Sequence, residues 1–141
     1  MTDTAADELA EEFLELDLAN RLQLLLEFAN SLPDLPPRYA DHPDLLERVE
    51  ECQSPVYLFT EVHSGVVEIF LTAPREAPTT RGFASILHSL LNGRTVEEVL
   101  NFDDDFPNRL GLREAISALR LRGMAGMLAR IKRQTREKSS V

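Results

Sequence analysis

A single cysteine, Cys52, is present among the 141 residues, and this scarcity excludes several kinds of site. An internal disulfide needs two thiols. A structural zinc ion normally takes four Cys or His ligands, and the three histidines are dispersed without ligand spacing. An iron–sulfur cluster held by protein thiolates needs several cysteines. We therefore expect no disulfide, no metal site and no cluster held by this chain alone.

Long hydrophobic runs are also absent. No apolar stretch approaches the roughly 20 residues that span a bilayer. The amino-terminal segment, MTDTAADELAEEF, is acidic, whereas a secretory signal begins with positive charge followed by an apolar stretch. These absences predict a soluble, cytoplasmic protein that does not act at a membrane.

Positive charge is scarce, and most of it lies at one end. The chain has 15 basic and 24 acidic residues and a net charge of −9, yet residues 109–141 carry a net charge of +7. Overall acidity opposes nonspecific binding to nucleic acid, which depends on clustered Lys and Arg. The basic end, ARIKRQTREK, is explained by cations at the last turn of a helix, with a tail for an acidic partner as the alternative. We expect no nucleic-acid partner.

Hydrophobic periodicity predicts helices in both terminal parts of the chain. Asp17 is placed to cap the second helix, and Thr95 begins a capping box that Glu98 completes. The expected helices cover about residues 4–15, Leu18 to Ala29, Thr79 or Thr80 to Leu91, a short segment after Thr95, and Ile116 to Ile131.

The middle of the chain has the composition of strands. Val56 to Glu61 and Val66 to Thr72 are rich in β-branched and aromatic residues, and His63-Ser64-Gly65 joins them tightly enough for a hairpin. The residues just before Cys52, particularly Val49, are expected to supply a short third strand. These patterns predict an α+β fold, in which a small antiparallel sheet of about three strands packs against helices. We expect residues 1–141 to form one domain.

Cys52 is the residue with the clearest potential for chemistry. The Gln-Ser-Pro sequence that follows it favours a turn or an exposed connection, so we expect the thiol on a loop. Glu50 and Glu51 precede it, and their charge raises a thiol pKa. The residue types leave two interpretations open: a cysteine without a special role, or a thiol that becomes reactive only when a partner activates it.

Other polar residues give weaker signals. The run Asp103-Asp104-Asp105 suggests either a hard-cation site or solvated and helix-capping carboxylates, and it lacks the spacing of a calcium loop. Arg81 and Arg120 lie beside apolar helical stripes, where an arginine either pairs with a surface carboxylate or serves a site. Met124 and Met127 are expected to fill the core.

Several segments of the sequence are similar to one known family. In chain order they read ECQSPVYL, TTRGFASIL, LNFDDDF, LGLREAISALRLRGM and ARIKRQ. These segments resemble the SufE family of sulfur-acceptor proteins, most closely its actinobacterial branch. The resemblance runs from about Ala19 to Arg133, and the order of several matched segments makes it far more specific than Cys52 alone.

The resemblance implies a SufE/IscU-like fold and a role in sulfur relay. A pyridoxal-phosphate cysteine desulfurase of the SufS type would be the partner, and it holds sulfur as a persulfide on its own cysteine. Cys52 matches the family's loop cysteine, which takes that sulfur toward iron–sulfur cluster assembly on a SufBCD-like scaffold. The resemblance implies an accessory to the desulfurase rather than a stand-alone enzyme, with no cofactor and no metal of its own.

The resemblance also assigns candidate site residues around Cys52. Arg120, followed by Gly123, matches the family's helix arginine, which would support the loop or the persulfide. The candidate binding residues are Glu51, Gln53, Ser54, Arg81 and Gly82. Two departures from the family pattern stand out: Glu51 replaces a common glycine before the cysteine, and Ala118-Leu119 replaces a common proline before the arginine.

Alternative functions remain open from the sequence. An IscU-like cluster scaffold shares the fold, but one thiolate cannot hold a cluster in a monomer. In a thiol-independent interaction module, only the helices would bind a partner and Cys52 would be incidental. A peroxidase that uses a lone thiol is disfavoured by the acidic residues beside Cys52.

Overall fold

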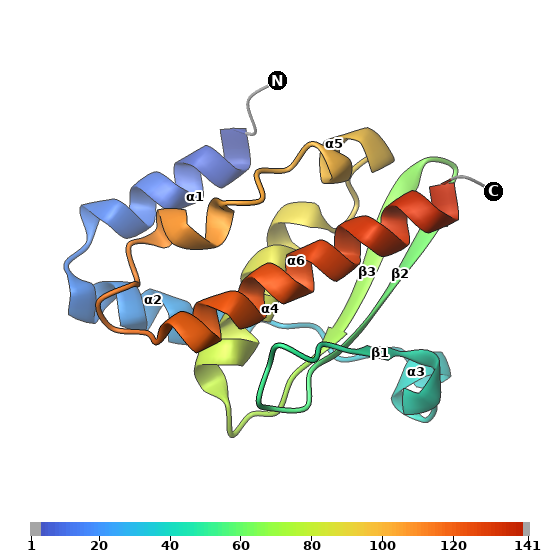
Figure 1. Ribbon diagram of the computed structural model, residues 1–141, viewed down its shortest axis with the longest axis horizontal. Coiled ribbons are helices and arrows are strands. Elements are labelled where there is room, and N and C mark those ends of the chain that lie inside the picture. Colours follow the sequence, from blue (N-terminus) through green and yellow to red (C-terminus); the bar gives the residue numbers. More distant parts are fainter. Residues whose placement is uncertain (1–3, 140–141) are drawn as a thin grey trace.

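The computed structural model of the protein describes residues 4–139 and has the predicted α+β architecture. Its helices and strands are α1 (Thr4–Glu15), α2 (Leu18–Ala29), α3 (Pro37–Ala40), β1 (Glu47–Arg48), β2 (Tyr57–His63), β3 (Val66–Thr72), α4 (Pro78–Leu91), α5 (Val96–Leu100) and α6 (Ala118–Ser139) (Figure 1). Two short 3-10 helices, η1 (Pro43–Leu45) and η2 (Phe106–Leu110), lie in the connections. Of the predicted domain, residues 1–3 and 140–141 lie outside the described part.

Local sequence signals account for the starts of α2 and α5. The Asp17 carboxylate accepts a 2.9 Å hydrogen bond from the Asn20 N–H and caps α2 as predicted. Thr95 and Glu98 form the predicted capping box at the start of α5. The last helix begins at Ala118 rather than Ile116, because Ile116 still belongs to a turn in which its N–H bonds the Leu112 carbonyl.

The sheet has the order β1-β2-β3, with antiparallel neighbours. β2 and β3 pair along their full length as the predicted hairpin. Ser64 and Gly65 both have positive φ, 53° and 78°, which is the geometry of a two-residue type I′ turn. The third strand is β1, directly before Val49, whose N–H still bonds the Val56 carbonyl at 2.9 Å.

The two faces of the hairpin have different environments. Side chains on one face, including Leu58, Ile69 and Leu71, are buried in the core. This face contacts α4 and α6, and α6 crosses in front of α4 and the hairpin in Figure 1. On the other face, the ring of Tyr39 from α3 lies about 5 Å from the rings of Phe59 and Phe70. The predicted surface connection after Pro33 is therefore partly helical and covers the outer face of the sheet.

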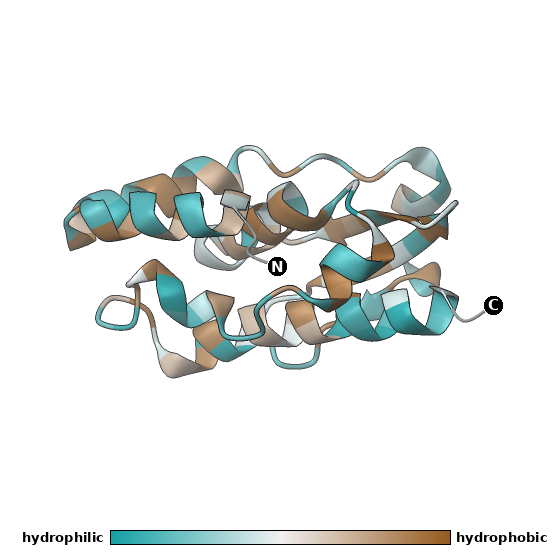
Figure 2. Cartoon of the chain, turned by 90° about the horizontal axis from the view of Figure 1, so that it is seen from above, coloured by the Kyte–Doolittle hydropathy of each residue, from teal (hydrophilic) through white to brown (hydrophobic). Residues whose placement is uncertain are grey.

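The basic carboxyl-terminal segment belongs to α6. Arg136 and Lys138 lie in its last turn, as the helix-end explanation predicts, and the end of α6 beside the C mark is hydrophilic in Figure 2. Lys138 donates a hydrogen bond to the Thr60 carbonyl, and its Nζ lies 3.3 Å from the centroid of the Phe59 ring. Within residues 4–139, no helix combines the length and the apolar character needed to cross a membrane.

Candidate functional site

Cys52 lies in the loop between β1 and β2, as predicted, but its side chain is not exposed. The base of the loop is closed by the hydrogen bond from Val49 N–H to the Val56 carbonyl, and both valines are fully buried. Within the loop, the Cys52 N–H bonds the Val49 carbonyl at 3.1 Å. Cys52 is only 7% exposed and belongs to the hydrophobic core, whereas Glu51 and Gln53 on either side of it are exposed.

A glycine of α6 explains why the thiol can be buried. A Cβ atom placed on Gly123 would lie 3.0 Å from the Cys52 Sγ, so the missing side chain leaves the space that the sulfur occupies. A cysteine side chain is small and weakly polar and packs readily in such a space. The sequence places the thiol on a loop but leaves its burial open, because the space that receives it comes from a helix far away in the sequence.

Burial and charge make the resting thiol a weak acid. The pKa of Cys52 is raised to about 11, mainly by desolvation and to a smaller extent by the Glu51 carboxylate. The cations of Arg130 and Arg48 act in the opposite direction but do not compensate. The sequence predicted that acidic neighbours raise the thiol pKa. Burial, which the sequence did not reveal, raises it more.

A pocket with a volume of about 220 Å³ opens beside the cysteine. Its lining brings together five of the predicted site residues, namely Glu51, Cys52, Gln53, Ser54 and Arg120. Gly123 lines it as well, and so does the first turn of α4 with Thr79 and Thr80. The amino-terminal turn of a helix carries partial positive charge, so this wall of the pocket favours an anion.

Arg120 supplies a cation at the rim of the pocket. It lies in the first turn of α6, three residues before Gly123 and therefore on the same side of the helix. Its side chain is exposed, and within residues 4–139 its guanidinium has no hydrogen-bond or ion-pair partner. Of the two roles considered for this arginine, pairing with a surface carboxylate is not what the structure shows.

Arg81 and Gly82 do not line this pocket. The Arg81 guanidinium is buried and donates hydrogen bonds to the Ala29 and Ala73 carbonyls at 2.9 and 2.6 Å. A Cβ atom on Gly82 would lie 2.5 Å from the Leu25 carbonyl oxygen, so this glycine lets α2 and α4 approach closely. Both residues therefore help to fix the position of the start of α4.

Sequence reasoning missed Arg130 and the role of Gly126 in the site. The Arg130 Nη1 lies 2.5 Å from a Glu51 carboxylate oxygen, and a Cβ atom on Gly126 would lie 2.7 Å from the Glu51 Cδ. Gly123, Gly126 and Arg130 follow at helical spacing, so they share one face of α6. That spacing was the available signal, but the glutamate it faces is distant in sequence.

Two carboxylate clusters are accounted for by contacts within the protein. Asp103 pairs with Arg109, Asp104 lies 2.7 Å from the Lys132 Nζ, and the Asp105 carboxylate accepts a hydrogen bond from the Asn108 side chain. The run is therefore held by ion pairs and a side-chain hydrogen bond within the protein, and the expected helix capping was wrong, because Asp105 at the start of η2 makes no side-chain cap hydrogen bond.

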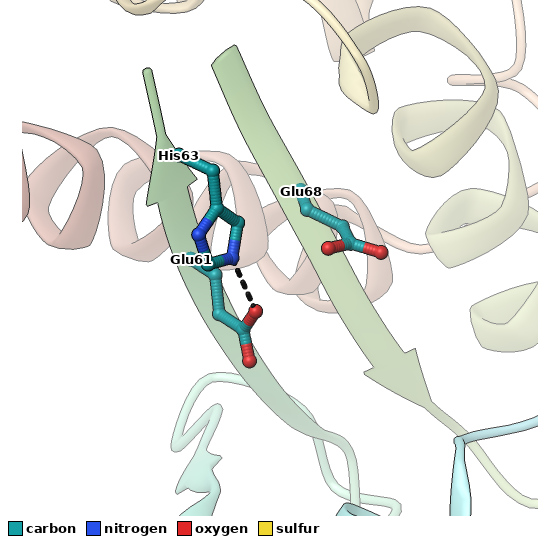
Figure 3. Close-up of side chains that lie close together, drawn as sticks. All are labelled: Glu61, His63 and Glu68. Carbon is teal, nitrogen blue, oxygen red and sulfur yellow. Dashed lines mark hydrogen bonds and ion pairs between the residues drawn. The ribbon is translucent and has the colours of Figure 1, made fainter. Parts of the chain in front are cut away.

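The second cluster lies on the β2–β3 hairpin. Glu61, His63 and Glu68 present polar atoms within 4.8 Å of one another (Figure 3). His63 Nε2 lies 2.7 Å from Glu61, which also pairs with Arg38 and accepts a hydrogen bond from the Tyr39 hydroxyl. These partners offset the repulsion between two glutamates that face each other across the strands.

Comparison with known proteins identifies the family. The sequence matches the profile of the family described as "SufE: Fe-S metabolism associated domain" over residues 7–135. The chain belongs to the SufE family. It is 48% identical over 131 residues to an uncharacterized SufE-like protein of Mycobacterium tuberculosis, covering 92% of this chain and 90% of the mycobacterial one. This relative agrees with the resemblance to the actinobacterial branch.

Other relatives extend this result. A SufE-like protein of Rhizobium meliloti is 28% identical over 135 residues, covering 92% of this chain and 93% of that one. The solution structure of a hypothetical protein from Thermus thermophilus has a TM-score of 0.85 and 35% identity over the whole of both chains. The fold described above is therefore the fold of a SufE-like protein.

Proposed function

We propose that this SufE-family protein is a sulfur acceptor for a pyridoxal-phosphate cysteine desulfurase. Cys52 takes sulfur from the persulfide of the desulfurase and passes it to an iron–sulfur cluster scaffold in the cytoplasm. The observation that carries this proposal is the position of Cys52, the only thiol of the chain, in a pocket that also presents Arg120 and the first turn of α4. The association of the family with Fe-S metabolism supports it.

The proposed step is a thiol–persulfide exchange that needs no oxidant. The Cys52 thiolate attacks the outer sulfur of the desulfurase persulfide, and a new sulfur–sulfur bond forms on Cys52. The bond between the two sulfur atoms of the desulfurase persulfide breaks, and its electron pair leaves with the desulfurase cysteine as a thiolate. The proton of the persulfide stays with the transferred sulfur, so atoms and charge balance.

The raised pKa of Cys52 explains how the thiol avoids side reactions between turnovers. With a pKa of about 11, only about one thiol in ten thousand is ionised at pH 7. Oxidation follows thiolate character and exposure, and the resting thiol has little of either. We propose that docking draws Cys52 out of its core position and into a more positive field on the partner.

The loop is suited to such a movement because little besides Cys52 would leave the core. Glu50, Glu51, Gln53 and Pro55 are already exposed. Releasing one small side chain costs about 1 kcal/mol in lost burial, and a partly exposed ion pair adds at most about 1 kcal/mol. A protein–protein interface can supply free energy on that scale. Arg120 and the first turn of α4 would then stabilise the anionic persulfide at the pocket.

Mass spectrometry tests the proposal directly. The protein is mixed with a cysteine desulfurase and L-cysteine under non-reducing conditions, and we expect the mass of one added sulfur atom, mapped to Cys52. Cys52→Ser serves as the control and should gain no sulfur. Sulfur found on no residue of the wild-type protein, with an active desulfurase, would contradict the proposal.

The burial of Cys52 favours a second candidate, a thiol-independent interaction module in which the cysteine only fills the core. The two candidates differ in what Cys52→Ser does to the rate of the desulfurase. A sulfur acceptor loses its stimulation of the desulfurase with this substitution. An interaction module keeps it in full, because the helices that bind are unchanged.

A further inference from the structure

Arg130 of α6 lies between two glutamates of the segment that contains the cysteine loop. Its Nη1 is 2.5 Å from a carboxylate oxygen of Glu51, inside the loop, and its Nε is 3.2 Å from Glu47, on β1. Nη1 also donates a 3.2 Å hydrogen bond to the carbonyl of Gly126, one turn earlier in the helix. The Arg130 side chain is only 16% exposed, so these contacts are largely shielded from water.

The two glutamates depend on Arg130 to different degrees. Glu47 also pairs with Arg133 and accepts a 2.8 Å hydrogen bond from the Gln134 side chain. These contacts keep β1 on α6 without Arg130. For Glu51, Arg130 is the only ion-pair partner within residues 4–139. Among residues 4–139, the ion pair to Glu51 is therefore the one ionic contact that holds the tip of the loop on the helix.

Two glycines of α6 leave neighbouring spaces for the Glu51 carboxylate and the Cys52 thiol. The carboxylate of Glu51 rests where a side chain on Gly126 would be, and the sulfur of Cys52 rests where a side chain on Gly123 would be. These glycines lie one turn apart on α6. Because Glu51 and Cys52 are consecutive in the chain, the sulfur cannot move far from α6 while the carboxylate stays in place.

We propose that Arg130 is a positioning residue for sulfur transfer, whose ion pair with Glu51 latches the loop in the form that buries Cys52 and opens when the thiol leaves the core. This inference rests on the proposed function, since only a cysteine that moves needs a latch. It gives Glu51 a role in setting how often the loop opens.

The reaction of Cys52 with iodoacetamide, a small neutral reagent, tests the latch in the isolated protein at pH 8. Arg130→Gln separates two effects of opposite sign. If the cation matters only through the ionisation of the thiol, its loss slows alkylation. If it latches the loop, its loss speeds alkylation, by about two- to five-fold for a partly exposed ion pair. An equal or slower rate would overturn the proposal.

Matched variants separate the latch from general loosening of the protein. Arg130→Lys, which keeps the charge, should restore most of the wild-type rate. Glu50→Gln changes the neighbouring exposed glutamate and should leave the rate unchanged. Gly126→Ala displaces the Glu51 carboxylate without changing any charge and should also speed alkylation. If Arg130→Gln fails to fold, Gly126→Ala carries the test alone, and an unchanged rate in that variant would then overturn the latch.

The latch and the proposed function fail in different experiments. Alkylation is measured without a desulfurase, whereas sulfur transfer is measured by mass with one. Unchanged alkylation in Arg130→Gln, together with an added sulfur on Cys52, would remove the latch and leave the sulfur acceptor intact. Faster alkylation without any added sulfur would leave the latch and remove the sulfur acceptor.

Discussion

The two halves of α6 hold two parts of the molecule in different ways. Toward its carboxyl end, long side chains reach the hairpin: Gln134 accepts a 2.7 Å hydrogen bond from the Thr60 N–H, and Lys138 reaches the Thr60 carbonyl. Toward its amino end, Gly123 and Gly126 present no side chain, and the cysteine loop lies in the space they leave. The carboxyl half of α6 therefore bonds the hairpin, and its amino half leaves space for the cysteine loop.

The hairpin has many more backbone hydrogen bonds than the cysteine loop. β2 and β3 pair over seven residues each, in a continuous antiparallel ladder. The loop between Val49 and Val56 has one backbone hydrogen bond at its base and one within it, which the Cys52 N–H donates to the Val49 carbonyl. Regions with few buried contacts and few backbone bonds open at low free-energy cost, and functional loops are drawn from them. The hairpin is therefore the more extensively bonded element, and the loop is the element that the proposed function requires to move.

The largest expected effect is a loss of stability from a substitution in the hairpin. Ile69→Ala removes a fully buried side chain of β3 and should lower the free energy of unfolding by about 2–5 kcal/mol. Cys52→Ala should lower it by only about 1 kcal/mol, because the loop contributes one small side chain to the core. Urea denaturation of the two variants measures both values. Equal losses would mean that the loop is as firmly built into the core as the hairpin.

An intermediate effect comes from filling the space under the thiol. Gly123→Ala places a Cβ 3.0 Å from the Cys52 Sγ, closer than ordinary packing allows. The cysteine is the part that can give way, so we expect faster alkylation of Cys52. The alanine also favours the helix by about 1 kcal/mol, so the free energy of unfolding should change little. Slower alkylation with a large loss of stability would show that the loop cannot move.

The smallest effect is a dependence of stability on pH. The pKa of Cys52 is about 11 in the folded protein against an ordinary 9.0, so the folded state binds the thiol proton more tightly than the unfolded state. This contribution to stability is complete below pH 9 and is lost as the pH rises from 9 to 11. The difference in unfolding free energy between wild type and Cys52→Ala should therefore shift in favour of Cys52→Ala across that window. A constant difference would contradict the raised pKa.

Much of the fold follows from patterns that act over a few residues. Asp17 caps α2, Ser64 and Gly65 close the hairpin, and Glu98 completes the box that Thr95 begins. The helix α3 escaped prediction because it has only four residues in a proline-rich stretch. Its position depends on Tyr39 packing against two rings of the sheet, a contact between distant residues.

In the candidate site, too, features set by neighbouring residues were predictable and contacts between distant residues were not. The loop and its cysteine were predictable from turn-forming residues, and the resemblance added Arg120 at the pocket. The burial of the thiol was not predictable, because it depends on Gly123 more than 70 residues along the chain. The same holds for Arg130, whose partner Glu51 is equally distant. The resemblance also pointed to the start of α4, but its arginine and glycine pack against α2 instead of lining the pocket.

The most direct test of the account is the reactivity of Cys52 with and without its partner. The alkylation rate is measured at pH 7.5 with a saturating desulfurase whose own catalytic cysteine has been replaced by alanine, so that no persulfide forms. We predict an increase of at least tenfold over the free protein, because docking exposes the thiol and lowers its pKa from about 11. An equal rate in a demonstrated complex would contradict the claim that Cys52 is buried at rest and released on docking.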